Sequence, residues 1–286
     1  MHAIDNIKAA GVVVLYNPDQ NVIENIDSYI NQIDRLFVVD NSEIQSKLIS
    51  EFSDSNPKCE YIFNNGNLGI ASALNIGARK AIEEGYNYLL TLDQDSIATS
   101  NMVKDLLNYY IKFKNEPVGI VTAFHNNKGT QELPKSKTSN VLTTMTSGNL
   151  LSLDAYRKAG PFKEDFFIDY VDKEYCLRLK SFGYNVVRLN YSILIHNLGN
   201  AFQKKILFRN FYVTNHSPIR IYYRTRNRFR VINEYKFKFP FYCIDDLKNF
   251  LVEIFKIVFY EEQVKEKLVM LRTGFRDYKK NIVGKY

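Results

Sequence analysis

Two carboxylates, separated by one residue, follow an apolar run in the first half of the chain. The run Leu89–Leu92 ends at Asp93, and Asp95 comes two residues later. In an extended segment residues i and i+2 point the same way, so both carboxylates can reach one point. Mg²⁺ and Mn²⁺ prefer oxygen ligands of this kind. A polar turn after a strand uses the same residue types, so a metal site and a plain turn both stay open.

Two later segments also carry residues that could do chemistry. Asp169, Asp172 and Glu174 surround the start of an expected helix, where acids either complement the helix dipole or act as a general base. His196 ends an apolar run, and it is either a structural histidine or a third metal ligand.

A glycine-containing loop precedes a helical pattern at residues 64–81. Gly66 and Gly69 let the backbone turn and approach a ligand closely. The following helix could offer its N-terminus to an anion, or the loop could simply be capped by Asn67. Neither a phosphate-binding Gly-Lys-Ser/Thr loop nor a G-x-G-x-x-G dinucleotide loop matches here.

Short apolar strands alternate with helical patterns before residue 200. Strands are expected at residues 11–17, 35–42, 59–64, 86–93, 118–124, 143–152 (interrupted by Gly148) and 184–190. Helices are expected at residues 21–33, 70–84, 102–113 and 172–182. This order predicts an α/β fold with an open, mostly parallel sheet flanked by helices on both faces. Ligands of such sheets gather at the carboxyl ends of the strands, where Asp40 and Asp93 share one edge.

The basic character of the chain belongs to its C-terminal third, which we expect to be helical. Residues 201–286 carry 19 Lys and Arg against 8 Asp and Glu, whereas residues 1–200 carry 19 against 23. The stretch Arg220–Val231 interleaves five arginines with aromatic residues, as phosphate or nucleic-acid binding would require. Residues 244–259 form an amphipathic pattern that suits a packed helix, an interfacial membrane helix or a dimer contact.

Composition narrows the class of protein. The chain has 286 residues, 45% of them hydrophobic and 24% charged, as in globular proteins. Its three cysteines are far apart and match neither a disulfide framework nor a zinc spacing. We expect no signal peptide in residues 1–10 and no transmembrane helix, because no run of 18 apolar residues occurs. A cytoplasmic protein is therefore expected.

Six segments, taken in order, carry a family resemblance. They are Asp40, the N-x-G-x-x-x-x-x-N run at 67–75, D-Q-D at 93–95, S-G-N at 147–149, I-D-Y-V-D-K-E-Y-C-L-R at 168–178 and H-N-L-G at 196–199. Over roughly residues 10–235 the chain resembles the family 2 inverting glycosyltransferases, which have the Rossmann-like GT-A fold. Within that family it is most similar to the bacterial rhamnosyltransferase-like branch.

The resemblance implies a role for each matching residue of the donor and metal site. It implies that Asp40 contacts the pyrimidine base of a nucleotide-sugar and that Asp93 lies near the ribose and the metal. Asp95 would ligate Mg²⁺ or Mn²⁺ under the diphosphate, and His196 would complete the metal shell. Further donor-binding positions implied by the matching motifs are Asn67, Asn75, Arg224, Arg226 and Asn227.

The resemblance also implies a catalytic base. Asp172 matches the acid that deprotonates the acceptor, although the family more often has two adjacent acids and here Val171 precedes it. Asp169 therefore remains a rival for this role. The segment containing Arg224, Arg226 and Asn227 would contact the donor diphosphate or a phosphorylated acceptor.

Together these expectations describe a metal-dependent inverting glycosyltransferase. Residues 1–215 are expected to form the GT-A catalytic domain, and residues 216–286 a basic helical region that is membrane-proximal or dimerising. The expected reaction moves L-rhamnose from dTDP-rhamnose to a saccharide or polyprenyl-linked acceptor in bacterial surface polysaccharide synthesis. The alternatives are a UDP-linked donor of galactofuranose, glucose or galactose, and a non-catalytic nucleotide-sugar-binding module.

The expected partners follow from the same resemblance. They are the nucleotide-sugar and its acceptor, with peripheral contact to the inner membrane face or a homodimer as uses of the C-terminal region. We expect no nucleic-acid partner, because the rest of the chain resembles a sugar transferase.

Overall fold

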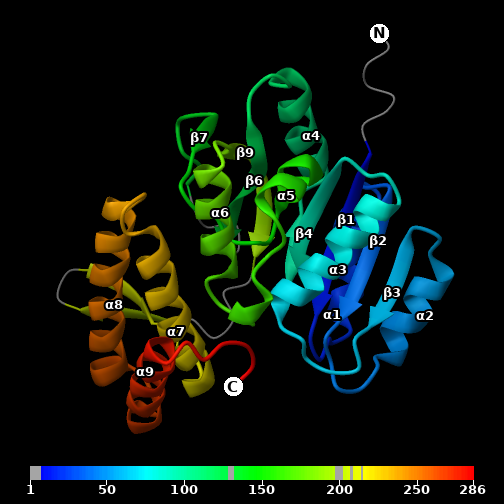
Figure 1. The fold of residues 1–286 in the computed structure, drawn as a ribbon. Helices are drawn as coiled ribbons and strands as arrows, with labels where there is room; N and C mark the ends of the chain where they lie inside the picture. The colour runs from blue at the N-terminus through cyan, green and yellow to red at the C-terminus, as the bar shows by residue number, and fades with distance from the viewer. Residues whose placement is uncertain (1–7, 128–131, 197–201, 207–208, 214) are drawn as a thin grey trace. The chain divides into compact units, whose positions relative to one another are not determined.

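The computed structural model describes residues 8–127, 132–196, 202–206, 209–213 and 215–286 (Figure 1). For residues 127, 196, 202–206 and 209–213 it describes the backbone but not the side chains. The chain forms two compact units. The first contains Met1–Glu164 and Asp172–Asn197, and the second contains Asp165–Val171 and Leu198–Tyr286.

A mixed sheet forms the centre of the first unit. Its strand order is β3-β2-β1-β4-β8-β6-β9-β5, and β7 pairs with β9. The strands are β1 (Ala9–Leu15), β2 (Arg35–Asp40), β3 (Cys59–Phe63), β4 (Tyr88–Asp93), β5 (Ser96–Ala98), β6 (Val118–Asn127), β7 (Thr138–Asn140), β8 (Asn149–Ser152) and β9 (Asn185–His196). β3, β2, β1 and β4 run parallel, as do β6 and β9, whereas β8 is antiparallel to both of its neighbours.

Helices cover both faces of this sheet, which explains why a central strand such as β1 is almost continuously apolar. They are α1 (Asn21–Ile30), α2 (Lys47–Ser55), α3 (Ile70–Glu83), α4 (Met102–Lys112), α5 (Leu153–Ala159) and α6 (Val171–Ser181). Figure 1 shows α3, α5 and α6 on the near face. α3 lies so close to β1 that a Cβ atom at Gly77 would come within 2.4 Å of Val12 Cγ2.

The second unit is mostly helical. It contains the antiparallel hairpin β10 (Phe202–Ile206) and β11 (Arg209–Val213), followed by α7 (Pro218–Tyr235), α8 (Pro240–Tyr260) and α9 (Val264–Lys279). Proline occupies the first position of α7 and of α8, where its missing N–H costs no helical hydrogen bond. α9 packs mainly against α7.

The predicted fold class is confirmed: an α/β sheet flanked by helices, with a helical C-terminal region. Two local predictions need correction. The strand expected at 143–152 is interrupted at Gly148 as predicted, where φ is +74°, but only Asn149–Ser152 is a strand and the residues before Gly148 are not. The chain beyond residue 200 was expected to be helical, but it begins with the β10–β11 hairpin. The division at residue 215 into a catalytic and a C-terminal region stays a prediction.

Candidate active site

The carboxyl ends of the strands beside β1 bring two predicted site residues to one edge of the sheet. In the parallel pairing, Leu15 lies opposite Asp40 and Val14 lies opposite Asp93. Because β2 and β4 flank β1 and all three run the same way, Asp40 and Asp93 leave the sheet at the same edge.

The turn that carries the two carboxylates is fixed by hydrogen bonds to its neighbours. The backbone N–H of Asp93 donates to the Ser147 hydroxyl at 3.1 Å, and that hydroxyl lies 2.6 Å from the hydroxyl of Ser96. The side-chain oxygen of Gln94 accepts from the Tyr16 backbone N–H at 2.9 Å. Asp93 and Asp95 are half-buried. The turn therefore presents its carboxylates from a backbone held on both sides.

The backbone of His196 also reaches this turn. In the antiparallel pairing of β5 with β9, His196 lies opposite Ser96, the residue after Asp95. Its side chain lies outside the described residues. Among the side chains that are described, no three His, Cys, Asp or Glu residues cluster as a metal site. Two carboxylates and an imidazole are nevertheless a donor set that suits Mg²⁺ or Mn²⁺.

Asp40 is a fully buried carboxylate whose oxygens already accept hydrogen bonds within the protein. One oxygen accepts from the Ser42 backbone N–H at 2.9 Å and from the Ser42 hydroxyl at 2.5 Å. The other accepts from the Tyr61 hydroxyl at 2.6 Å. Burial, together with the hydrogen bond and the charge of Asp40, raises the pKa of Tyr61 well above its usual value. Tyr61 therefore keeps its proton and holds Asp40 in place.

The Asn67 loop lies next to the end of β2. The side chain of Asn67 accepts a hydrogen bond from the Gly69 backbone N–H at 2.9 Å, and Gly69 has a φ of +86° that suits glycine. The Gly69 carbonyl in turn accepts from the side chain of Asn41 at 3.1 Å. Asn67 thus fixes the entry to α3 near Asp40, and its predicted contact with the donor stays a prediction.

Asn75 occupies the protein interior. Its side-chain nitrogen donates to the Phe162 carbonyl and to Glu164, each at 2.9 Å. Its oxygen accepts from the Phe162 backbone N–H and from the Tyr156 hydroxyl, again at 2.9 Å. These four bonds tie α3 to α5 and to the segment that follows it. They give Asn75 a structural role, and its donor contact stays a prediction.

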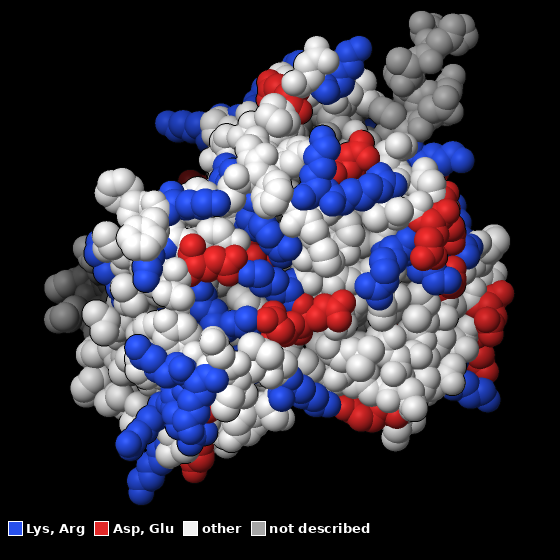
Figure 2. Space-filling view, viewed as in Figure 1, with Lys and Arg blue, Asp and Glu red and all other residues white. Residues whose placement is uncertain are grey.

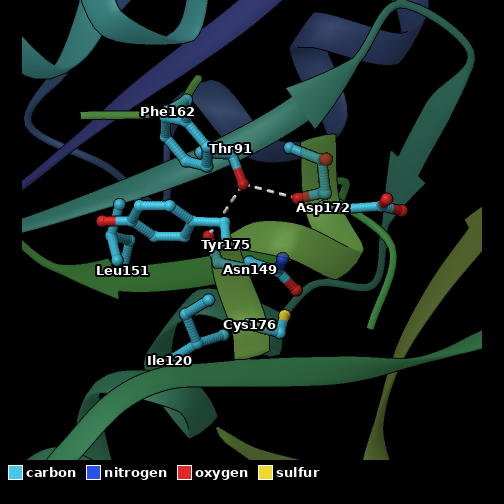
Figure 3. A pocket seen from close by; sticks show the side chains of 9 residues that line it. Thr91, Ile120, Asn149, Leu151, Phe162, Asp172, Tyr175 and Cys176 are labelled. Carbon is cyan, nitrogen blue, oxygen red and sulfur yellow. Dashed lines mark hydrogen bonds between the residues drawn. The ribbon is translucent and has the colours of Figure 1, made fainter. Parts of the chain in front are cut away.

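Asp172, at the start of α6, lines a small pocket in the first unit (Figure 3). Thr91 and Asn149 line the same pocket. Thr91 lies two residues before Asp93 on β4, so its side chain is on the same strand face as Asp93. Asp172 therefore shares a pocket with a residue of β4, the strand that ends at Asp93.

The thiol beside this pocket is not available as a nucleophile. Burial raises the pKa of Cys176 to about 12, so the thiol stays protonated near neutral pH. The side chain of Asp172, in contrast, is half-buried, and one of its oxygens accepts from the Lys173 backbone N–H at 2.7 Å. A carboxylate is the group at this pocket that can accept a proton.

The rival Asp169 is bound by an arginine in the second unit. The Arg220 guanidinium donates to both oxygens of Asp169, at 2.7 and 3.2 Å. Asp169 has a left-handed φ of +61°, as do its neighbours Phe167 and Tyr170 at +64° and +67°. Such backbone persists only where the surroundings hold it. The bidentate pair makes Asp169 a structural anchor for this segment.

Two of the predicted binding residues on α7 hold that segment. The fully buried side chain of Asn227 donates to the carbonyls of Phe166, Ile168 and Asp169 at 2.9, 2.9 and 3.0 Å. The buried guanidinium of Arg226 donates to the carbonyls of Gly284, Asp165 and Phe166. Both side chains therefore stabilise the left-handed segment, and their predicted contact with the donor stays a prediction.

Arg224 lies on the same helix but binds a carboxylate instead. Its guanidinium forms an ion pair with Glu253 on α8 at 2.9 Å. The side chain of Arg224 is 26% exposed, so part of it can still meet solvent.

Ser147 and Tyr61 support the site although the sequence did not predict this role for either residue. Ser147 belongs to the S-G-N motif, which served only as a family marker. No sequence motif contains Tyr61. Its hydrogen bond to Asp40 depends on the pairing of β2 with β3.

Comparison with known proteins identifies the family. A family model described as "Glycosyl transferase family 2" matches residues 12–168. The dTDP-rhamnosyl transferase RfbF of Shigella flexneri is 28% identical over 254 residues, which are 80% of this chain and 81% of that protein.

Solved structures share the fold at low sequence identity. GalNAc-T7 with UDP, GalNAc and Mn²⁺ superposes with a TM-score of 0.62 at 12% identity, covering 97% of this chain and 57% of that one. S. aureus TarS 1–349 in complex with UDP-GlcNAc gives 0.56 at 13% identity, covering 96% and 92%. They confirm the expected GT-A fold, and the family model covers more than half of the chain. The chain belongs to glycosyl transferase family 2.

Proposed function

We propose that this protein is a metal-dependent, inverting rhamnosyltransferase that uses dTDP-rhamnose. The observation that carries the choice of sugar is the 28% identity, over 80% of the chain, with a dTDP-rhamnosyl transferase. The acceptor would be a saccharide or a polyprenyl-linked saccharide of a bacterial surface polysaccharide. A lipid-linked acceptor lies at the inner face of the membrane, so the proposal includes a cytoplasmic location with peripheral membrane contact.

The proposed chemistry begins with the acceptor hydroxyl. The carboxylate of Asp172 takes the hydroxyl proton as the oxygen attacks carbon 1 of the sugar from the face opposite the diphosphate. The bond between carbon 1 and the diphosphate oxygen breaks, and its electron pair leaves with the nucleoside diphosphate. One displacement of this kind inverts the anomeric carbon. Placing donor and acceptor in this geometry supplies much of the rate enhancement.

The leaving group gains negative charge as this bond breaks. A divalent cation, when bound, would neutralise that charge without needing a proton. Asp93, Asp95 and His196 are the residues proposed to hold it. Asp40 is proposed to face the base of the nucleotide from its buried position beside Tyr61, and Arg224 to meet the diphosphate or a phosphorylated acceptor.

A UDP-linked donor is the second candidate. The observation in its favour is that two structural relatives were solved with UDP or UDP-GlcNAc. At 12% and 13% identity they inform the fold more than the sugar.

A donor panel separates these candidates. Purified protein is incubated with Mn²⁺ and with dTDP-rhamnose, UDP-galactofuranose, UDP-glucose or UDP-galactose, and nucleoside diphosphate release is measured. The proposal expects the fastest release from dTDP-rhamnose. Faster release from a UDP-sugar would make that sugar the donor in place of dTDP-rhamnose. Donor binding without turnover on any donor or acceptor would indicate a non-catalytic module.

A further inference from the structure

Helix α8 has an unusual distribution of side chains between its inner and outer faces. It has 21 residues, about 31 Å of helix. Its outward side exposes eight large apolar side chains, each at least 37% accessible. They are Phe241, Ile244, Leu247, Leu251, Val252, Phe255, Val258 and Phe259.

The inward side of α8 carries carboxylates that are paired with α7. Asp246 is 4% exposed and lies 3.3 Å from Arg228, which is also 2.7 Å from Glu253. The Tyr170 hydroxyl donates to Asp246 at 2.8 Å. Buried charges need such partners, because leaving water is costly for each ion. The inner side of α8 thus combines two paired carboxylates with the buried Cys243, Phe250 and Ile257, while large apolar side chains also cover its outer side, where an ordinary surface helix is polar.

A basic helix adjoins this apolar face. α9 packs against α8 and exposes Lys265, Arg272, Arg276 and Lys279. Figure 2 shows Lys and Arg side chains gathered over α9, next to uncharged surface over α8. We call these apolar residues of α8 and basic residues of α9 the α8–α9 surface.

We propose that the α8–α9 surface binds an anionic membrane surface. Exposed apolar patches of this size mark interaction sites, and a basic face beside an apolar one suits a negatively charged lipid interface. Lys248 lies within the apolar face, between Ile244, Leu251 and Val252 on the helix surface, and its long stem can carry the ammonium to the headgroups.

Charge favours a membrane over a second copy of the chain as the occupant. Residues 201–286 carry 19 Lys and Arg against 8 Asp and Glu. A twofold dimer through this surface would bring its cations together, whereas anionic headgroups neutralise them. Among the described residues no helix is long and apolar enough to span a membrane. The proposed contact is therefore interfacial, and it does not depend on which sugar is transferred.

Vesicle co-sedimentation of the full chain tests this proposal. The vesicles contain phosphatidylcholine alone or phosphatidylcholine mixed with phosphatidylglycerol. We expect sedimentation with the phosphatidylglycerol vesicles, weaker sedimentation with phosphatidylcholine, and a decrease as salt is raised. Leu251→Asp should abolish sedimentation, whereas the matched control Leu48→Asp, an exposed leucine on α2, should sediment like the wild type.

A second variant tests the charges without touching the apolar face. Lys265→Gln with Arg272→Gln should weaken vesicle binding about fivefold for each charge removed. Both variants should keep the wild-type unfolding temperature and the wild-type turnover of a water-soluble acceptor, which separates this proposal from the reaction itself. The proposal would be overturned if sedimentation were the same with and without phosphatidylglycerol, or if the Leu251→Asp variant sedimented like the wild type. A wild-type dimer that Leu251→Asp makes monomeric, without vesicle binding, would assign the surface to a second copy.

Discussion

The hydroxyl of Ser147 accepts a hydrogen bond from the backbone N–H of Asp93 at 3.1 Å. Ser147 is fully buried, and it also lies 2.6 Å from the hydroxyl of Ser96, on the other side of Asp95. One serine therefore supports both ends of the turn that carries the carboxylate pair. This contact joins the S-G-N and D-Q-D segments, which are far apart in the sequence.

Ser147→Ala should weaken the proposed metal site as well as destabilise the fold. The variant leaves the Asp93 N–H without its acceptor, at a cost of about 1–3 kcal/mol. The metal concentration that gives half-maximal activity should rise about tenfold or more, as when groups behind metal ligands are lost. Ser46→Ala, which removes the N-cap of α2 at a cost of about 1 kcal/mol, is the matched control. Equal metal dependence in both variants would contradict the assigned role.

Asp172→Asn should retain donor binding and lose transfer. Without the carboxylate the acceptor keeps its proton, so we expect a decrease in kcat of about 10²–10⁴. Calorimetry with the donor and single-turnover transfer measure the two properties separately. Asp169→Asn is the comparison. Because Asp169 is paired with Arg220, this substitution should lower the free energy of unfolding and leave the rate of transfer largely unchanged. If Asp169→Asn abolished transfer in a stably folded protein and Asp172→Asn did not, the roles would be reversed.

The stability of the protein should fall as the pH drops from about 6.5 toward about 4. Burial and the nearby Arg224 and Arg220 lower the pKa of His216 from 6.5 to about 4. In that window the unfolded chain binds a proton that the folded protein does not, so acid favours unfolding by on the order of 1–3 kcal/mol. Chemical denaturation across this range measures the effect. His216→Asn should flatten the dependence, and an unchanged slope would refute the assignment.

Asp246→Asn should strongly destabilise the second unit. It removes a buried charge partner of Arg228, which is 2% exposed, and we expect a loss on the order of 3 kcal/mol. The neighbouring exposed residue provides the control: Asp245→Asn should change the free energy of unfolding by less than about 0.5 kcal/mol. Similar effects of the two substitutions would show that the inner face of α8 is not held by this pair.

The sequence predicted the strand-end carboxylates because their signal is local. Asp40 and Asp93 each follow an apolar strand, and parallel strands align their carboxyl ends at one edge. The partners of these carboxylates were not predictable in the same way. Tyr61 and Ser147 reach Asp40 and Asp93 only through strand pairing, which no nearby residue in the sequence reveals.

Buried polar residues were the hardest to interpret from the sequence. Asn227 and Arg226 were predicted to bind the donor because the family resemblance places their segment near the active site. The structure shows them holding the backbone of Asp165–Asp169, whose left-handed residues no sequence pattern had indicated. The apolar face of α8 was visible as a pattern, but the sequence did not show that it faces outward; in the structure the paired carboxylates Asp246 and Glu253 lie on the inner side.

The most direct test of the proposed reaction is metal-dependent release of dTDP from dTDP-rhamnose by the wild type and by Asp95→Ala. The wild type should release dTDP with Mn²⁺ or Mg²⁺ and lose that activity with a chelator. The rate of dTDP release should be at least about 100-fold lower in Asp95→Ala, because the negative charge of the leaving diphosphate is no longer neutralised. Asp154→Ala, an exposed carboxylate on α5, should behave like the wild type. Full, metal-dependent activity of Asp95→Ala would contradict the proposed site.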